Sequence, residues 1–126
     1  MGWRNVLVAG FVVLLAGCAS SGPDLSKARD EMEVGVEAGQ RGYWREALFR
    51  FERAQKASPD DPEVLNNVAV ALEAVGRYDD ALATYKKALA AAPKNQTLRR
   101  NYARFAEFFT SFARGVKPKG EPNATR

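Results

Sequence analysis

The sequence predicts an all-α protein: a short solenoid of two helix–turn–helix repeats, closed by a C-terminal capping helix. The first observation is that residues 42–59 return, 34 residues later, as residues 76–93. A fixed period of this length is the signature of a repeat architecture. The second observation is that each copy opens on a glycine and closes on a proline, which turn and break helices. The repeated core positions are Gly42, Trp44, Ala47, Phe51, Ala54 and Pro59 in one copy and Gly76, Tyr78, Ala81, Tyr85, Ala88 and Pro93 in the other.

The first two helices are predicted over about residues 27–40 and 43–57. Gly35 and Gly39 lie inside the first helix, and an interior glycine costs about 1 kcal/mol relative to alanine. The turn between the two helices contains Gly42, a residue suited to a left-handed C-terminal cap. A Ser-Pro-Asp stretch ends the second helix.

The third and fourth helices are predicted over about residues 62–75 and 78–91. Asp61 is a good N-cap, and Pro62 suits the first helical position. Gly76 supplies the turn between the two helices, as in the preceding copy, and a proline follows the fourth helix.

The fifth helix is predicted over about residues 96–114, with Asn95 as its N-cap. Thr110 stands where the turn glycine would repeat, so we expect this helix to continue instead of turning back. Its apolar residues form one stripe at helical spacing, which favours a helix that caps the open end of the array. Phe108 lies off this stripe. The stripe consists of Leu98, Tyr102, Phe105, Phe109 and Phe112.

The repeat resembles the tetratricopeptide repeat over about residues 28–95. That family has a helix–turn–helix unit of this length, with a tail of the form A-x3-F…P. The tail is matched by Ala47-x3-Phe51…Pro59 and by Ala81-x3-Tyr85…Pro93. The first half of the family motif reads Leu65-x2-Val68-Ala69-x2-Leu72 in the second copy and Glu31-x2-Val34-Gly35-x2-Ala38 in the first.

Composition argues against an enzyme. The 126 residues suffice for one domain, and 46% hydrophobic with 27% charged residues is typical of a globular chain. The chain has no histidine and one cysteine, which removes the commonest general base and every cysteine cluster for zinc. Carboxylates gather at predicted helix starts, where they favour the helix dipole. We predict no catalytic residue, no metal site and no cofactor.

The N-terminus reads as a targeting segment. An apolar run from Val6 to Leu15 follows a basic start; it is shorter than the roughly 20 residues that span a bilayer and suits a signal-peptide core. The run ends in Leu15-Ala16-Gly17-Cys18, which resembles a bacterial lipobox. The resemblance implies a lipoprotein signal peptide over residues 1–17 and a lipid on the sulfur of Cys18. An ordinary signal followed by a buried cysteine is the alternative.

Residues 18–26 are predicted to be a lipidated flexible tether, rich in serine and glycine. Ala19 is not the aspartate that retains enterobacterial lipoproteins at the inner membrane. We therefore expect an outer-membrane anchor that faces the periplasm, and a helical domain over residues 27–114 held close to the bilayer.

The family resemblance also implies a binding groove. In tetratricopeptide arrays the first helix of each pair lines a concave groove that holds an extended peptide or a helix. Chaperone-binding members clamp a terminal carboxylate with Lys and Asn on that helix; here Met32 and Val36 stand at those positions, and only Asn67 matches. The candidate groove residues are Met32, Val36, Asn66, Asn67, Val70, Arg100, Asn101 and Arg104.

Charge is distributed unevenly along the chain. From Arg99 onward there are seven basic and two acidic residues, a net +5, whereas Cys18 to Leu98 has eleven basic and thirteen acidic residues, a net −2. Residues 115–126 are expected to be a disordered basic tail. The basic end could pair with the acidic first helix of another copy, bind anionic lipid or cell-wall polymer, or simply be solvated. The aromatic residues lie on core positions, so nucleic-acid binding is not expected.

The function these patterns favour is that of a membrane-anchored, non-enzymatic adaptor for protein partners at the bacterial envelope, in assembly of an envelope, pilus or secretion complex. The array resembles fragments of larger lipoproteins that serve such assembly. The alternative is a structural protein that holds cell-wall polymer or anionic lipid through its basic end. A regulatory subunit of an envelope enzyme is a third reading.

Overall fold

A computed structural model describes residues 24–113 and 115, and these residues form five helices and no strand. The predicted signal peptide, most of the tether and all of the tail except Gly115 lie outside the described residues. The helices are α1 (Leu25–Gln40), α2 (Trp44–Ala57), α3 (Pro62–Ala74), α4 (Tyr78–Ala91) and α5 (Gln96–Ala113). The all-α solenoid predicted from the sequence is confirmed.

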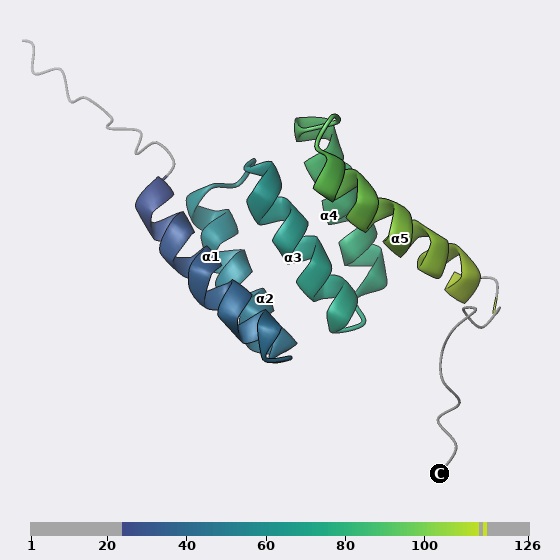
Figure 1. Ribbon diagram of the computed structural model, residues 1–126, viewed down its shortest axis with the longest axis horizontal. Coiled ribbons are helices and arrows are strands. Elements are labelled where there is room, and N and C mark those ends of the chain that lie inside the picture. Colours follow the sequence, from purple (N-terminus) through teal and green to yellow (C-terminus); the bar gives the residue numbers. More distant parts are fainter. Residues whose placement is uncertain (1–23, 114, 116–126) are drawn as a thin grey trace, which may run out of the picture.

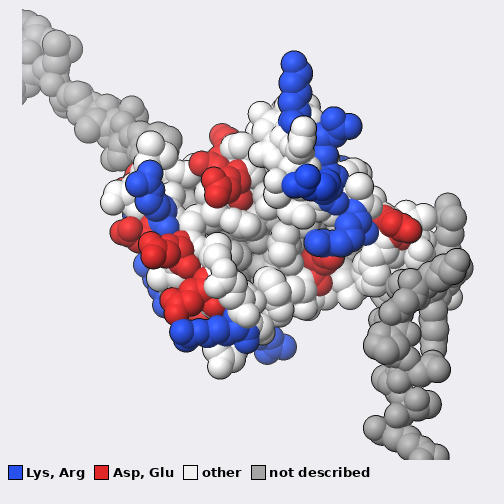
Figure 2. Space-filling view, in the orientation of Figure 1, with Lys and Arg blue, Asp and Glu red and all other residues white. Residues whose placement is uncertain are grey.

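The helices form two layers (Figure 1). Helices α1, α3 and α5 make the nearer layer, and α2 and α4 lie behind them. Helix α3 is central, because it contacts all four other helices. We call the surface formed by α1, α3 and α5 the three-helix face; it is the face seen in the space-filling view of Figure 2.

The turns repeat as the sequence predicted. Gly42 and Gly76 have φ of +81° and +82°, a left-handed conformation that side chains with a Cβ disfavour. Asp61 Oδ1 accepts hydrogen bonds from the backbone N–H groups of Glu63 (2.8 Å) and Val64 (3.2 Å), as expected of an N-cap. Helix α1 begins two residues earlier than predicted, because Asp24 caps it.

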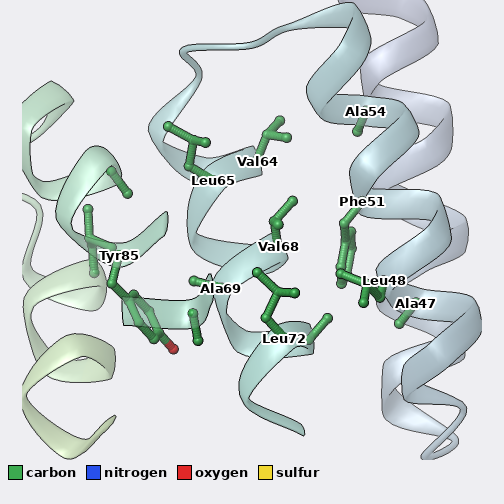
Figure 3. Packing of buried hydrophobic residues seen from close by; sticks show 14 of the residues in the cluster. Ala47, Leu48, Phe51, Ala54, Val64, Leu65, Val68, Ala69, Leu72 and Tyr85 are labelled. Carbon is green, nitrogen blue, oxygen red and sulfur yellow. The ribbon is translucent and has the colours of Figure 1, made fainter. Parts of the chain in front are cut away.

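The core lies between the two layers and is built from the repeated positions. Ala47 and Ala81 are fully buried, and Tyr85 and Phe51 are 0% and 3% exposed. Figure 3 shows Val68 on the side of α3 that faces Phe51 of α2. The small side chains let the large rings fill the space between helices, which maximises apolar contact.

Two glycines of α1 sit against aromatic rings of α2. A Cβ built on Gly35 would stand 2.6 Å from Cδ1 of Phe51, a distance no real Cβ contact shows. A Cβ on Gly39 would stand 3.1 Å from Cζ3 of Trp44, a half-buried ring. The close approach of α1 and α2 therefore depends on Gly35 more than on Gly39.

Glu31 is a charged residue at a core position of the first copy, where the second copy has an apolar one. It occupies the position where the second copy has buried Leu65, and it is itself only 8% exposed. Its carboxylate lies 2.7 Å from Nε of Arg53 and 3.4 Å from Nη1 of Arg50, both on α2. The two guanidinium groups compensate the buried charge that an apolar residue would have avoided.

Helix α5 caps the array, but only some residues of its predicted apolar stripe are buried. Leu98 and Phe105 are buried, whereas Phe112 is 56% exposed. Phe108, which the sequence left without a role, packs edge-on against Tyr78 of α4 with ring centroids 5.1 Å apart. Because α5 runs straight past residue 110, its last turn reaches the start of α4 and places Phe108 there.

Candidate functional site

The candidate groove residues all lie on α1, α3 and α5, the helices of the three-helix face. They differ in how much of each side chain reaches solvent. Met32, Asn66, Asn67, Val70 and Asn101 are half-buried, whereas Val36, Arg100 and Arg104 are exposed. The half-buried members lie between neighbouring helices, and the exposed ones are accessible to a partner.

Polar contacts join this face across the helix boundaries. Asn101 Nδ2 donates a hydrogen bond of 3.0 Å to Oδ1 of Asn66, which links α5 to α3. Asn67 Nδ2 lies 3.7 Å from the sulfur of Met32, which links α3 to α1. An asparagine side chain has two donors and two acceptor lone pairs, so each amide keeps capacity for a ligand. The contacts hold these amides in fixed orientations.

A third cross-helix contact involves Glu73, a residue that was absent from the predicted groove. Nη2 of Arg104 lies 3.5 Å from Oε2 of Glu73, and the hydroxyl of Tyr85 donates to the same oxygen at 3.1 Å. Burial and the neighbouring carboxylate raise the pKa of Tyr85, so it stays a neutral donor. Glu73 follows Val70 by three residues, a spacing that places both on one helical face and could have identified it.

Two hollows of about 290 Å³ each open beside the first turn of α3. Both are at the lower limit of the 300–1,000 Å³ typical of small-molecule sites, so they suit side chains of a partner more than a cofactor. One lies between α3 and α5 and the other between α1 and α3, and Glu63 lines both. The first is lined by Pro62, Glu63, Asn66, Asn67, Asn95, Thr97 and Leu98, and the second by Leu25, Ala28, Arg29, Met32, Ser58, Asp61, Glu63 and Val64.

Charge divides the three-helix face. Figure 2 shows acidic side chains over α1, flanked by basic ones, a further acidic group near the start of α3, and basic side chains over the first half of α5. The exposed acidic residues of α1 include Asp30, Glu33 and Glu37, and the exposed basic residues of α5 are Arg99, Arg100 and Arg104. A segment lying across the face would therefore meet opposite charges at its two ends.

We next consider metal binding, membrane spanning and lipidation among the described residues. Among them no group of three or more His, Cys, Asp or Glu side chains is placed to hold a metal ion. None of the five helices has the length and apolarity needed to cross a membrane. The predicted lipid site, Cys18, lies outside the described residues.

Comparison with known proteins identifies the repeat. A family model described as "Tetratricopeptide repeat" matches residues 35–96. Among solved structures, the chain is similar to a mutant of MamA, with a TM-score of 0.56 and 20% sequence identity. That match covers 72% of this chain and 57% of the MamA chain, so this chain spans little more than half the length of that neighbour.

A second solved structure aligns over a similar length. It is the first TPR of Spaghetti (RPAP3) bound to an HSP90 peptide, with a TM-score of 0.36 and 17% identity over 70% of this chain and 97% of that one. The comparison with curated proteins finds no significant match.

Proposed function

Because this chain is a tetratricopeptide repeat protein, we propose that it is a non-enzymatic adaptor which binds a segment of another protein across the three-helix face. The proposal rests chiefly on the row of half-buried amides from Asn66, Asn67 and Asn101. Amides can donate to and accept from a peptide backbone at once. Since they are already oriented by contacts between helices, little side-chain entropy is lost when a partner binds.

The two hollows and the charges of the three-helix face also suit an extended peptide segment. The two hollows beside α3 are spaced along one surface and each takes one or two side chains. The acidic α1 and the basic α5 favour a segment with opposite charges at its two ends, which fixes its direction and suppresses wrong partners. Val36, one of two exposed valines of α1, adds apolar contact at one end of this surface.

The location we propose is the periplasmic side of a bacterial outer membrane, reached through a lipid on Cys18. The support is the apolar run and the lipobox-like Leu15-Ala16-Gly17-Cys18 in the sequence. Several acyl chains anchor a protein stably, where a single chain does not. A short tether would then hold the adaptor close to the bilayer, among the proteins of an envelope assembly.

Site-directed photo-cross-linking tests the face directly. A benzoylphenylalanine replaces exposed Val36 on α1 in the full chain, expressed in the cells that naturally make it. The matched control carries the same probe at exposed Ala83 on α4, away from the three-helix face. We expect a discrete protein adduct from the probe on α1 and none from the control.

A second variant ties the adduct to the amides. Asn67→Ala combined with Arg104→Ala should lower the adduct yield about tenfold, the equivalent of two modest polar contacts. Circular dichroism and melting temperature should stay nearly unchanged. The ion pair of exposed Arg104 contributes little to stability, and Asn67 loses only a weak 3.7 Å contact to a sulfur. Equal adducts from both probe positions, or an adduct indifferent to the double substitution, would place the binding surface elsewhere.

A further inference from the structure

The open end of the array carries a further hollow, which shares only Arg99 and Arg100 with the basic edge of the three-helix face. It has a volume of about 730 Å³ and lies between α4 and the first turns of α5. Apolar side chains form part of its wall, and two arginines stand beside them. The lining includes Leu89, Pro93, Tyr102, Ala103, Arg99 and Arg100.

Neither arginine has an anionic partner within the described part of the chain. No carboxylate oxygen among residues 24–113 forms an ion pair with Arg99 or Arg100, and the one side-chain contact of Arg100 is a 3.3 Å hydrogen bond to Thr97. By contrast, Arg104, one turn further along α5, pairs with Glu73. The hollow therefore combines apolar surface with two uncompensated positive charges.

The repeat register shows what kind of surface this is. Arg99 and Ala103 stand 34 residues after Leu65 and Ala69. Figure 3 shows Leu65 and Ala69 on the side of α3 that faces Tyr85 of α4, and both are fully buried. The matching side of α5 has no following helix among the described residues, so a helix-packing surface is left open there.

The same register reveals a complementary surface at the other end. Val64 and Val68 of α3 are buried on the side toward α2, and 34 residues earlier α1 carries Asp30 and Val34. Val34 is 42% exposed, and Asp30 forms no ion pair with another described residue. Helix α1 thus presents an uncovered packing face with an apolar residue beside an unpaired acid.

We propose that these two end faces bind each other between copies of this chain, so that α1 of one copy docks on the hollow of the next. Asp30 meets Arg99, and Val34 meets the apolar wall around Ala103. The docked helix is a first helix of its pair, unlike the second helices α4 and α2 that cover the matching sides of α3. It nevertheless covers both end faces, which benefits an array whose two repeats are fewer than the three usually needed for a stable stack. The contact joins unlike faces, so it builds open chains and not a closed dimer.

Paired cysteines test the contact in the full chain, purified in detergent with Cys18→Ser to remove the native thiol. One preparation carries Val34→Cys and another carries Ala103→Cys. Mild oxidation of the mixture should give a disulfide-linked pair, and each preparation alone should give no disulfide-linked product on a denaturing gel. Ala83→Cys replaces Ala103→Cys in the control mixture. A chain with both cysteines should give a ladder of multimers.

Charge reversal distinguishes specific binding of the two end faces from disulfides that form by random encounter of the two cysteines. Arg99→Glu in the Ala103→Cys chain should lower the linked product about tenfold, because it sets two acids face to face. Asp30→Arg in the Val34→Cys chain should restore it. The groove variant Asn67→Ala with Arg104→Ala should link as well as the unmodified face, which keeps this test independent of the proposed adaptor site.

Three outcomes would overturn the proposal. The first is a disulfide-linked yield no higher than that of the Ala83 control, and the second is efficient linking of either preparation with itself. The third is a loss of linked product with Arg99→Glu that Asp30→Arg does not restore. An unlinked chain that sediments with phosphatidylglycerol vesicles in an Arg99-dependent way would assign the basic end to an anionic surface instead.

Discussion

Replacing Gly35 by alanine isolates the contact on which the first helix pair depends. In a helix, alanine is about 1 kcal/mol more favourable than glycine, so an uncrowded position would be stabilised. The added methyl group of Gly35→Ala, however, would lie 2.6 Å from Cδ1 of the buried Phe51 ring. Overpacking of a well-packed core costs about 1–3 kcal/mol. Subtracting the propensity gain leaves a net loss of about 0–2 kcal/mol. Because the clash is with a buried ring, we expect a value toward the upper end of that range.

Gly39→Ala is the matched control on the same helix. Its new methyl group would lie 3.1 Å from the ring of Trp44, which is half-buried and can move by the few tenths of an ångström required. The propensity gain then offsets the crowding. We expect stability within about 0.5 kcal/mol of the parent, as for a substitution without a severe clash.

Thermal melts followed by circular dichroism at the helix band measure both variants. For a domain of this size each 1 kcal/mol shifts the midpoint by about 4–8 °C, so Gly35→Ala should melt clearly below Gly39→Ala. Adding Phe51→Leu should reduce the penalty of Gly35→Ala, which a double-mutant cycle detects as a coupling energy. A Gly35→Ala protein as stable as the control or more stable would refute the packing of that ring against α1.

Three further predictions concern other parts of the chain. Cys18→Ser should leave an unlipidated, unprocessed precursor, and palmitate incorporated equally into the variant would contradict the lipoprotein reading. Ala81→Leu at a fully buried position should destabilise the domain by about 1–3 kcal/mol, whereas Lys86→Ala on the exposed side of α4 should cost under about 0.5 kcal/mol. Melts that coincide would contradict the repeat register. The raised pKa of Tyr85 keeps its proton bound in the folded state after the unfolded state begins to lose it, so stability should fall as pH rises above about 10. Tyr85→Phe should flatten that alkaline decline, and identical pH profiles would show that the hydroxyl is not held as described.

The sequence predicted the helices wherever the repeat period supplied a template. Glycine at each turn and a cap before α3 and α5 placed those boundaries within one residue. The start of α1 was missed because its cap, Asp24, stands outside the period: the residue 34 before Asp61 is Lys27. Phe108 was missed for a related reason, since α5 does not turn at Thr110 and no earlier copy shows what its last turns contact.

The face was predictable in outline and not in detail. Helical register alone grouped the candidate residues on one surface, because that grouping depends only on spacing along the chain. The hydrogen bond between Asn66 and Asn101 depends on side-chain rotamers and on the distance between two helices, which spacing does not determine. The buried Glu31 was likewise invisible as a compensated charge, because Arg50 and Arg53 lie a whole helix further along the chain.

The packing of Trp44 beside Gly39 also allows the cooperativity of unfolding between the two repeats to be measured by fluorescence. The chain has two tryptophans, and Trp44 is the one within the described residues, at the junction of α1 and α2. In a chain cleaved before Cys18, as the sequence predicts, the emission spectrum comes from Trp44 alone and senses the first repeat, whereas the helical dichroism signal averages over both repeats. In a nearest-neighbour array the repeats can melt at separate temperatures if the interface between them is weak. The gap between the fluorescence and dichroism midpoints would thus measure how strongly α3 couples the two repeats, without any label or substitution.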